Sequence, residues 1–213
     1  MTRDQQIETI RHMAATIQQT AYDESWIGTG NPSLAFLICL AMGPWKEARR
    51  FTIAKKVVAA ALSLGGELYF DLALAKPGMF PYPLEWQNKI VNHIVEELRS
   101  IPDLRFFHCM DRWWTMLSVE TEYDDCWDSV ALEFFDMCGV SKKGTKTLWL
   151  FLRDVLGIPA FPIDRRVRRV LRAHGLPADS WVITRLCEEA GVRTNDLARA
   201  CFVHGEANGT AVK

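Results

Sequence analysis

The sequence lacks the marks of several common protein classes. It has no CxxC pair and no closely spaced cysteine cluster, although six cysteines occur among its 213 residues. Neither a zinc site nor an iron–sulfur centre is therefore expected. It also lacks a signal-peptide core and any run of roughly 18 uncharged apolar residues that could cross a membrane. These absences predict a cytoplasmic protein with reduced thiols, no metal, no cofactor and no membrane partner.

The chain has no excess of positive charge either. Its formal net charge is -1, which excludes a uniformly basic nucleic-acid-binding protein. Any affinity for nucleic acid must come from a local basic patch. The length suits one compact domain or two small lobes that share a core.

Strand signals are few, because sustained period-two alternation and hairpin dipeptides are scarce, so we expect an all-α protein. Segment 67–83 should be a loop with at most a short element, since it contains Pro77, Pro81 and Pro83. Gly65-Gly66 should end a helix. Apolar residues at helical spacing, with capping or helix-breaking residues at the ends, predict helices over 3–21, 84–100, 103–117 and 126–138. They also predict two helices joined by a turn within 33–64.

Positive charge is concentrated in one segment. Between Val140 and Val170 there are eight basic residues and two acidic ones, Asp154 and Asp164, so the segment has a net charge of +6. It comes directly after an acidic stretch. Contact with phosphates requires a basic face of this kind, although a solvated helix surface explains the charge equally well. The basic residues are Lys142, Lys143, Lys146, Arg153, Arg165, Arg166, Arg168 and Arg169.

The elements around this charge follow a definite order. Residues 140–146 resemble a tight turn, in which Lys142, Lys143, Gly144 and Thr145 could hold a backbone phosphate with the N-terminus of a helix over 147–155. Gly157 ends that helix, and the proline-containing residues 158–163 form a rigid connector. Asp164 should then cap a helix running to about residue 173, with Val167, Val170 and Leu171 facing inward and the arginines outward.

The stretch GTKTLWLFLRDVLGIPAFPIDRRVRRVLRAHGLP, residues 144–177, resembles the helix-hairpin-helix and Gly/Pro-Asp signature of the endonuclease III superfamily of DNA glycosylases. A weaker similarity covers 196–205, which looks like the late helix of that family that ends in His-Gly. The resemblance implies a two-lobed, all-α fold with the active site in the cleft between lobes. Residues 31–164 would form a helical barrel lobe containing the hairpin at about 138–156, and 1–30 plus 165–213 the second lobe.

The resemblance also implies a set of functional residues. Asp164 would be the essential carboxylate, which stabilises positive charge on the sugar as the base leaves. Lys146, whose neutral form the helix dipole and the neighbouring lysines favour, would attack C1′ and form a Schiff base. Apart from the resemblance, the turn and the basic charge make Lys142, Lys143, Gly144, Thr145, Arg165, Arg166, Arg168 and Arg169 candidate DNA contacts. The candidate pocket residues for a flipped base are Trp26, Trp45, Asp196 and His204.

Each role has a simpler alternative. Asp164 could be a plain helix cap, and Lys146 a phosphate-binding or solvated lysine. The tryptophans could be core or surface residues, and we expect Trp113, Trp114, Trp127 and Trp149 in the core. Asp196 could cap a helix, and His204 could be a buried structural histidine.

The sequence departs from the family pattern in three ways: Lys142 stands where the first hairpin glycine is usual, no cysteine cluster follows Gly205, and no glutamine-rich wedge is visible. These departures favour the 8-oxoguanine branch. We therefore expect a monomer that excises a damaged base from double-stranded DNA, with associated AP-lyase activity, in the nucleoid if the source is prokaryotic. Two alternatives stay open: a defence glycosylase that removes modified bases from phage DNA, and a non-catalytic helix-hairpin-helix module that binds DNA.

Overall fold

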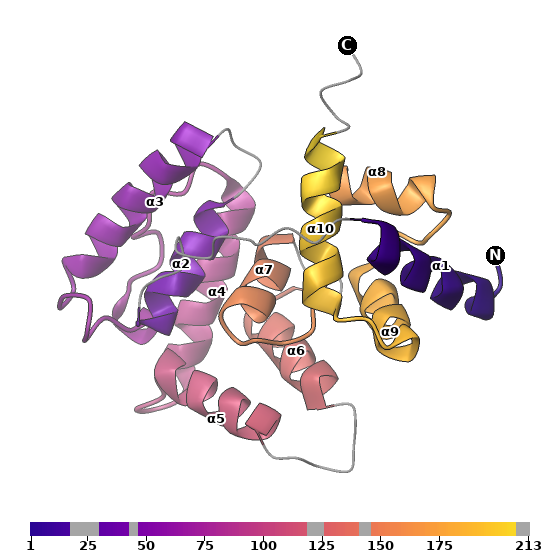
Figure 1. Ribbon diagram of the computed structural model, residues 1–213. Coiled ribbons are helices and arrows are strands. Elements are labelled where there is room, and N and C mark those ends of the chain that lie inside the picture. The colour runs from indigo at the N-terminus through magenta and orange to yellow at the C-terminus, as the bar shows by residue number, and fades with distance from the viewer. Residues whose placement is uncertain (18–29, 43–46, 119–125, 141–145, 208–213) are drawn as a thin grey trace. The chain divides into compact units, whose positions relative to one another are not determined.

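The computed structural model describes residues 1–17, 30–42, 47–118, 126–140 and 146–207, and the regular structure within these ranges is helical, without strands. The prediction of an all-α protein is thus confirmed. The chain divides into two compact units (Figure 1). Unit 1 combines Met1–Glu24 with Gly157–Lys213, and unit 2 is the continuous segment Ser25–Leu156. This division groups the connector and Asp164 with the two chain ends, whereas the sequence-based boundary followed residue 164.

Unit 2 is built around one helix that is buried along nearly its whole length. Residues Ser33–Ala41 of α2 are all buried, which explains why this segment is apolar all round. Helices α3, α5 and α7 pack against α2. The elements are α2 (Pro32–Ala41), α3 (Glu47–Leu62), the 3-10 helix η2 (Leu72–Leu74), α4 (Glu85–Ser100), α5 (Phe106–Ser118), α6 (Cys126–Met137) and α7 (Lys146–Asp154).

Polar caps attach the loop before α4 to this core. Asn31 caps α2 by accepting the Leu34 amide at 3.1 Å, and its side-chain amide donates to the carbonyls of Glu67 and Phe70, both at 2.7 Å. The buried carboxylate of Asp71 accepts three backbone amides, those of Ala73, Phe106 and Phe107. One aspartate therefore begins both η2 and α5.

An aromatic cluster fills the centre of unit 2. Phe36 of α2 lies 5.3 to 5.9 Å, between ring centroids, from Phe106, Phe134 and Phe151. Trp113, Trp127 and Trp149 are buried as predicted. The prediction for Trp114 was wrong, because its side chain is 40 % exposed: consecutive helical residues point about 100° apart, and Trp113 already faces the core.

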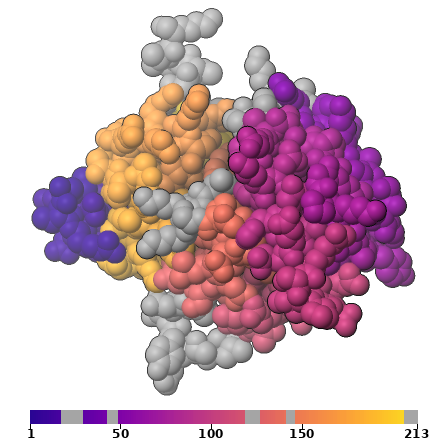
Figure 2. All heavy atoms as spheres, turned by 180° about the vertical axis from the view of Figure 1, so that it is seen from behind, coloured from indigo at the N-terminus to yellow at the C-terminus, as the bar shows by residue number. Residues whose placement is uncertain are grey.

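Unit 1 is formed by both ends of the chain and contains four helices within its described residues. Helix α10 packs against α8 and α9, and α1 packs against α9 (Figure 1). In the space-filling view α1 is the indigo edge of this unit (Figure 2). The helices are α1 (Arg3–Thr16), α8 (Arg165–Ala173), α9 (Ser180–Ala190) and α10 (Thr194–Ala207).

The predicted helices lie where the structure has helices, with small differences at their ends. Helix α1 ends at Thr16, where Ile17 takes an extended conformation, and the predicted residues 18–21 lie outside the described ranges. Gly65 and Gly66 stop α3, since both have positive φ and both amides donate to the Leu62 carbonyl. Within the described residues, none of the helices has the length and hydropathy needed to cross a membrane.

Candidate functional site

Asp164 is held at the start of α8 by the backbone of the helix it caps. Its Oδ1 accepts the amides of Arg166 and Val167 at 2.8 and 2.9 Å, and its own backbone is extended. The side chain is half-buried. The positive end of the helix dipole and two amide donors stabilise the charged carboxylate at this position. The predicted N-cap geometry is confirmed.

Helix α8 separates apolar from basic residues almost completely. Val167, Val170 and Leu171 are buried in the core of unit 1, and the exposed residues include Arg165, Arg168, Arg169 and Arg172. Arg166 is half-buried, with its guanidinium carbon 5.0 Å from the centroid of the Phe202 ring, where cation–π attraction restrains it. The predicted inward face is confirmed, and so is the outward position of the arginines other than Arg166; Arg172 extends the basic face by one turn.

Helix α10 holds both the connector and the first turn of α8. The amide of Ala160, in the middle of the connector, donates to Asn195 Oδ1 at 3.1 Å. Ile158, Ala160 and Phe161 are fully buried, so packing holds the connector as well. The backbone leading into Asp164 therefore has little freedom.

The other end of α10 lies against the same turn of α8 through a glycine. A Cβ atom on Gly205 would stand 2.9 Å from the carbonyl oxygen of Arg166 and 3.0 Å from its carbonyl carbon. Only glycine allows this approach. The predicted late helix is present, but it continues through His204 and Gly205 to Ala207, because the glycine serves helix packing and not helix termination.

Sequence reasoning missed Asn195, which contacts the connector, and Phe202, which contacts Arg166; both belong to α10. Neither position carries a sequence signal, since an asparagine in a first helical turn and a phenylalanine on a helix are both common. Their roles depend on which helix crosses the connector, and this is a tertiary property.

Lys146 begins α7 in unit 2, where its side chain is half-buried. Helix α7 starts where the resemblance requires a helix after the hairpin. The hairpin residues proposed to bind phosphate, Lys142, Lys143, Gly144 and Thr145, lie outside the described residues. Lys146 belongs to unit 2 and Asp164 to unit 1.

One residue counted with the basic segment does not belong to a basic face. The Arg153 side chain is 5 % exposed and forms an ion pair with Asp154, whose side chain is fully buried. Two guanidinium bonds, from Nε and from Nη2, go to the carboxylate of this neighbouring residue. The two charges therefore cancel within unit 2, and the charge available for phosphates is that of the remaining lysines and arginines.

The four candidate pocket residues fall into two groups. Trp26 and Trp45 lie outside the described residues. Asp196 is half-buried in the first turn of α10 and pairs with Arg193 Nε at 2.7 Å. His204 is exposed in the last turn of α10, so the alternative of a buried structural histidine was wrong.

Among the described residues, no group of three or more His, Cys, Asp or Glu side chains is arranged to hold a metal ion. The arrangement in unit 1 instead offers one carboxylate, fixed by backbone amides and bordered by exposed guanidinium groups. Such a pairing can stabilise positive charge on a substrate that is itself polyanionic. Comparison with protein-family models, with curated proteins and with solved structures gives no match for this chain.

Proposed function

We propose that the chain is a DNA glycosylase of the helix-hairpin-helix class, with Asp164 as its essential carboxylate. The observation that supports this best is the position of Asp164 at the N-terminus of α8, where Oδ1 accepts two helix amides and exposed arginines follow on the same helix. The arginines bind phosphates on either side of the target nucleotide, and the carboxylate acts on its sugar.

Asp164 acts through electrostatics in this reaction. As the bond between C1′ and the base nitrogen breaks, the electron pair leaves with the base and the sugar becomes an oxocarbenium ion. The Asp164 carboxylate, which the two capping bonds to Oδ1 hold in place, stabilises that charge. The helix amides keep the carboxylate oriented without reorganisation during the reaction.

Lys146 supplies the nucleophile in the lyase form of the reaction. Its amine forms a bond to C1′ as the base leaves, and the amine proton passes to a carboxylate or to water. Cleavage of the bond between C1′ and the ring oxygen then opens the sugar and gives a Schiff base, after which elimination of the 3′ phosphate nicks the strand. Water takes the place of the amine in a monofunctional enzyme.

The proposed partner is double-stranded DNA that carries a damaged base. A monomer binds it without a cofactor, and the proposed fold is the two-lobed one of this superfamily. Because the cysteine cluster and glutamine-rich wedge of the endonuclease III branch are missing from the sequence, 8-oxoguanine is the first base to test.

The decisive experiment replaces Asp164 by Asn and measures base release from duplexes that carry a panel of damaged bases. Asparagine still caps the helix, so DNA binding should remain while base release falls about 100-fold or more. Asp179→Asn is the matched control, because Asp179 caps α9 in the same way, through the amides of Trp181 and Val182. If Asp164→Asn released the base as fast as the wild type, or if the wild type released no base at all, the glycosylase proposal would fail. The remaining hypothesis would then be a non-catalytic module that binds DNA.

The lyase step is tested separately by trapping with borohydride. Wild-type protein should form a covalent adduct with the damaged duplex, and Lys146→Gln should form none. Lys89→Gln serves as the control, since Lys89 is an exposed lysine of the same unit whose ammonium pairs with Glu85. Base release without any adduct in the wild type would make the enzyme monofunctional and remove the role of Lys146.

A further inference from the structure

A pocket of about 470 Å³ opens in unit 2 among α4, α5 and α6. None of the residues given a role in base excision lines it. Its volume falls within the range of ligand sites in proteins. The lining residues are Glu97, Leu98, Ile101, Leu104, His108, Cys109, Arg112, Glu133, Asp136 and Met137.

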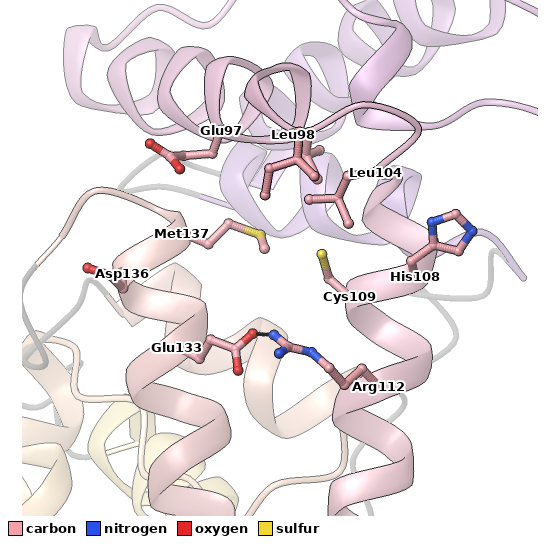
Figure 3. A pocket seen from close by; sticks show the side chains of 10 residues that line it. Glu97, Leu98, Leu104, His108, Cys109, Arg112, Glu133, Asp136 and Met137 are labelled. Carbon is pink, nitrogen blue, oxygen red and sulfur yellow. Dashed lines mark ion pairs between the residues drawn. The ribbon is translucent and has the colours of Figure 1, made fainter.

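The centre of the pocket is apolar and one end is closed by an ion pair. Figure 3 shows Leu98, Leu104, Met137 and the Cys109 sulfur converging on it. Arg112 of α5 pairs with Glu133 of α6 across the closed end (Figure 3). The site therefore offers room for an aliphatic side chain.

The closed end is rigid, because Glu133 has a second partner. The indole nitrogen of Trp113, a fully buried residue, donates to Glu133 Oε1 at 2.9 Å. Glu133 is thus committed to Arg112 and Trp113. The two carboxylates at the rim are Asp136 and Glu97, whose Oε1 lies 4.0 Å from His93 Nε2.

Part of the apolar lining of the pocket is exposed. Ile101, which lines it, is 54 % exposed. Exposed apolar residues that adjoin a pocket and are bordered by charged groups are typical of a protein-interaction site.

The charged residues that line the pocket are mostly negative. They are Glu97, Glu133 and Asp136 against Arg112, a net charge of -2 with His108 neutral. Figure 3 shows Glu97 and Asp136 on the same side of the pocket, and both are exposed. This sign repels nucleic acid and favours a basic partner.

We propose that this pocket is the docking site for a basic, amphipathic helix of a partner protein. One aliphatic side chain of that helix enters between Leu98, Leu104 and Met137, and its lysines or arginines lie beside Glu97 and Asp136. Apolar anchors in a groove with complementary charge at the rim are the usual mode of helix recognition.

The test uses a fluorescein-labelled peptide of about 18 residues, long enough to form a helix, with leucines at helical spacing on one face and lysines on the other. Fluorescence anisotropy should show saturable binding to the whole protein. Ile101→Arg, which fills the pocket with a cation, should weaken binding about tenfold or more. Leu68→Arg makes the same change at another exposed apolar residue of unit 2, 86 % exposed, and should leave binding unchanged.

A second pair of variants tests the charge contribution. Asp136→Asn should weaken binding of the lysine peptide about threefold, whereas Asp111→Asn, an exposed aspartate of α5 outside the pocket, should not. The four substituted residues are exposed, and equal thermal midpoints would show that folding is intact. The proposal is overturned if the peptide does not bind, if Ile101→Arg and Leu68→Arg weaken binding equally, or if a peptide with glutamates in place of lysines binds equally well. It is also overturned if the protein alone forms a dimer that Ile101→Arg dissociates, because the occupant of the pocket would then be a second copy of the chain.

Discussion

Asp71 and Asp164 are both capping aspartates, but they differ in burial and in the elements that they join. Asp71 is buried at 9 % exposure and uses both oxygens, Oδ1 for the amides of Ala73 and Phe106 and Oδ2 for that of Phe107. Asp164 is half-buried and accepts both helix amides on Oδ1. Asp71 therefore joins two elements, whereas Asp164 caps one helix and is partly exposed.

The structural role of Asp71 predicts a large loss of stability on its removal. Asp71→Ala leaves three backbone amides without their acceptor, and each buried unsatisfied donor costs about 1 to 3 kcal/mol. We expect the free energy of unfolding, measured in urea, to fall by about 3 kcal/mol or more, and by less in Asp71→Asn, which keeps one acceptor oxygen. Asp111→Ala, at an exposed position of α5, should change stability by less than about 0.5 kcal/mol; equal effects at both aspartates would contradict the capping role.

Buried thiols predict a loss of stability in alkali. Burial raises the pKa of Cys187 and of Cys201 to about 12, from an ordinary value near 9. Above pH 9 the unfolded chain releases these protons while the folded chain retains them. The contribution of the two thiols to the free energy of unfolding is therefore complete below pH 9 and is lost between pH 9 and 12. The loss should reach roughly 4 kcal/mol for each thiol at pH 12.

Urea unfolding at pH 8 and at pH 10.5 measures this effect. The double variant Cys187→Ala/Cys201→Ala should lose less stability between the two pH values than the wild type does. An equal loss in both proteins would mean that other groups cause the alkaline destabilisation.

At the scale of elements, α10 determines where α8 begins. It accepts the connector amide of Ala160 through Asn195 and lies against the backbone of Arg166 through Gly205. The two contacts lie on either side of Asp164 in the sequence. The position of Asp164 is therefore set by a different helix from the one it caps.

This arrangement predicts that Gly205→Ala reduces activity as well as stability. The added methyl group would lie 2.9 Å from the Arg166 carbonyl oxygen, so α8 or α10 must shift, at a cost of about 1 to 2 kcal/mol after the gain in helix propensity. Base release should fall further than the decrease in folded protein explains, because Asp164 moves with the first turn of α8. Gly30→Ala is the control, since a Cβ there meets nothing within 4 Å; wild-type release by Gly205→Ala would argue against this positioning role.

Helix positions could be predicted from the sequence because the signals are local. The apolar spacing of α4, the Asn31-Pro32 start of α2 and the Asp164 start of α8 each depend on a few neighbouring residues. Burial depends on the whole unit, and for that reason Arg153 was wrongly counted with the basic face and Trp114 with the core. The role of Gly205 could not be predicted, because its neighbour Arg166 is distant in the sequence.

At the scale of the whole molecule, a net charge of -1 coexists with a strongly basic helix. If α8 binds DNA, the salt dependence of binding must come from a few arginines and not from overall charge. Arg168→Gln/Arg169→Gln should weaken DNA binding and reduce the slope of log K against log salt by about 0.9 for each phosphate that is no longer neutralised. The measurement is a series of DNA titrations at increasing salt.

Lys55→Gln/Lys56→Gln makes the same change of charge on the exposed surface of α3 and provides the control. Its salt slope should equal that of the wild type. Equal slopes for both double variants would show that the basic face of α8 does not meet phosphates.

The packing of α1 against α9 has a consequence for the order in which the chain folds. Unit 2 is a continuous segment, Ser25–Leu156, and it can fold as soon as its own residues have left the ribosome. Helix α1 is synthesised before unit 2 but must wait for α9, and at about 5 to 20 residues per second that wait lasts roughly ten seconds or longer. The apolar side chains of α1, Ile10 and Met13, fully buried in the finished protein, stay exposed for that period, so α1 is open to chaperones during synthesis.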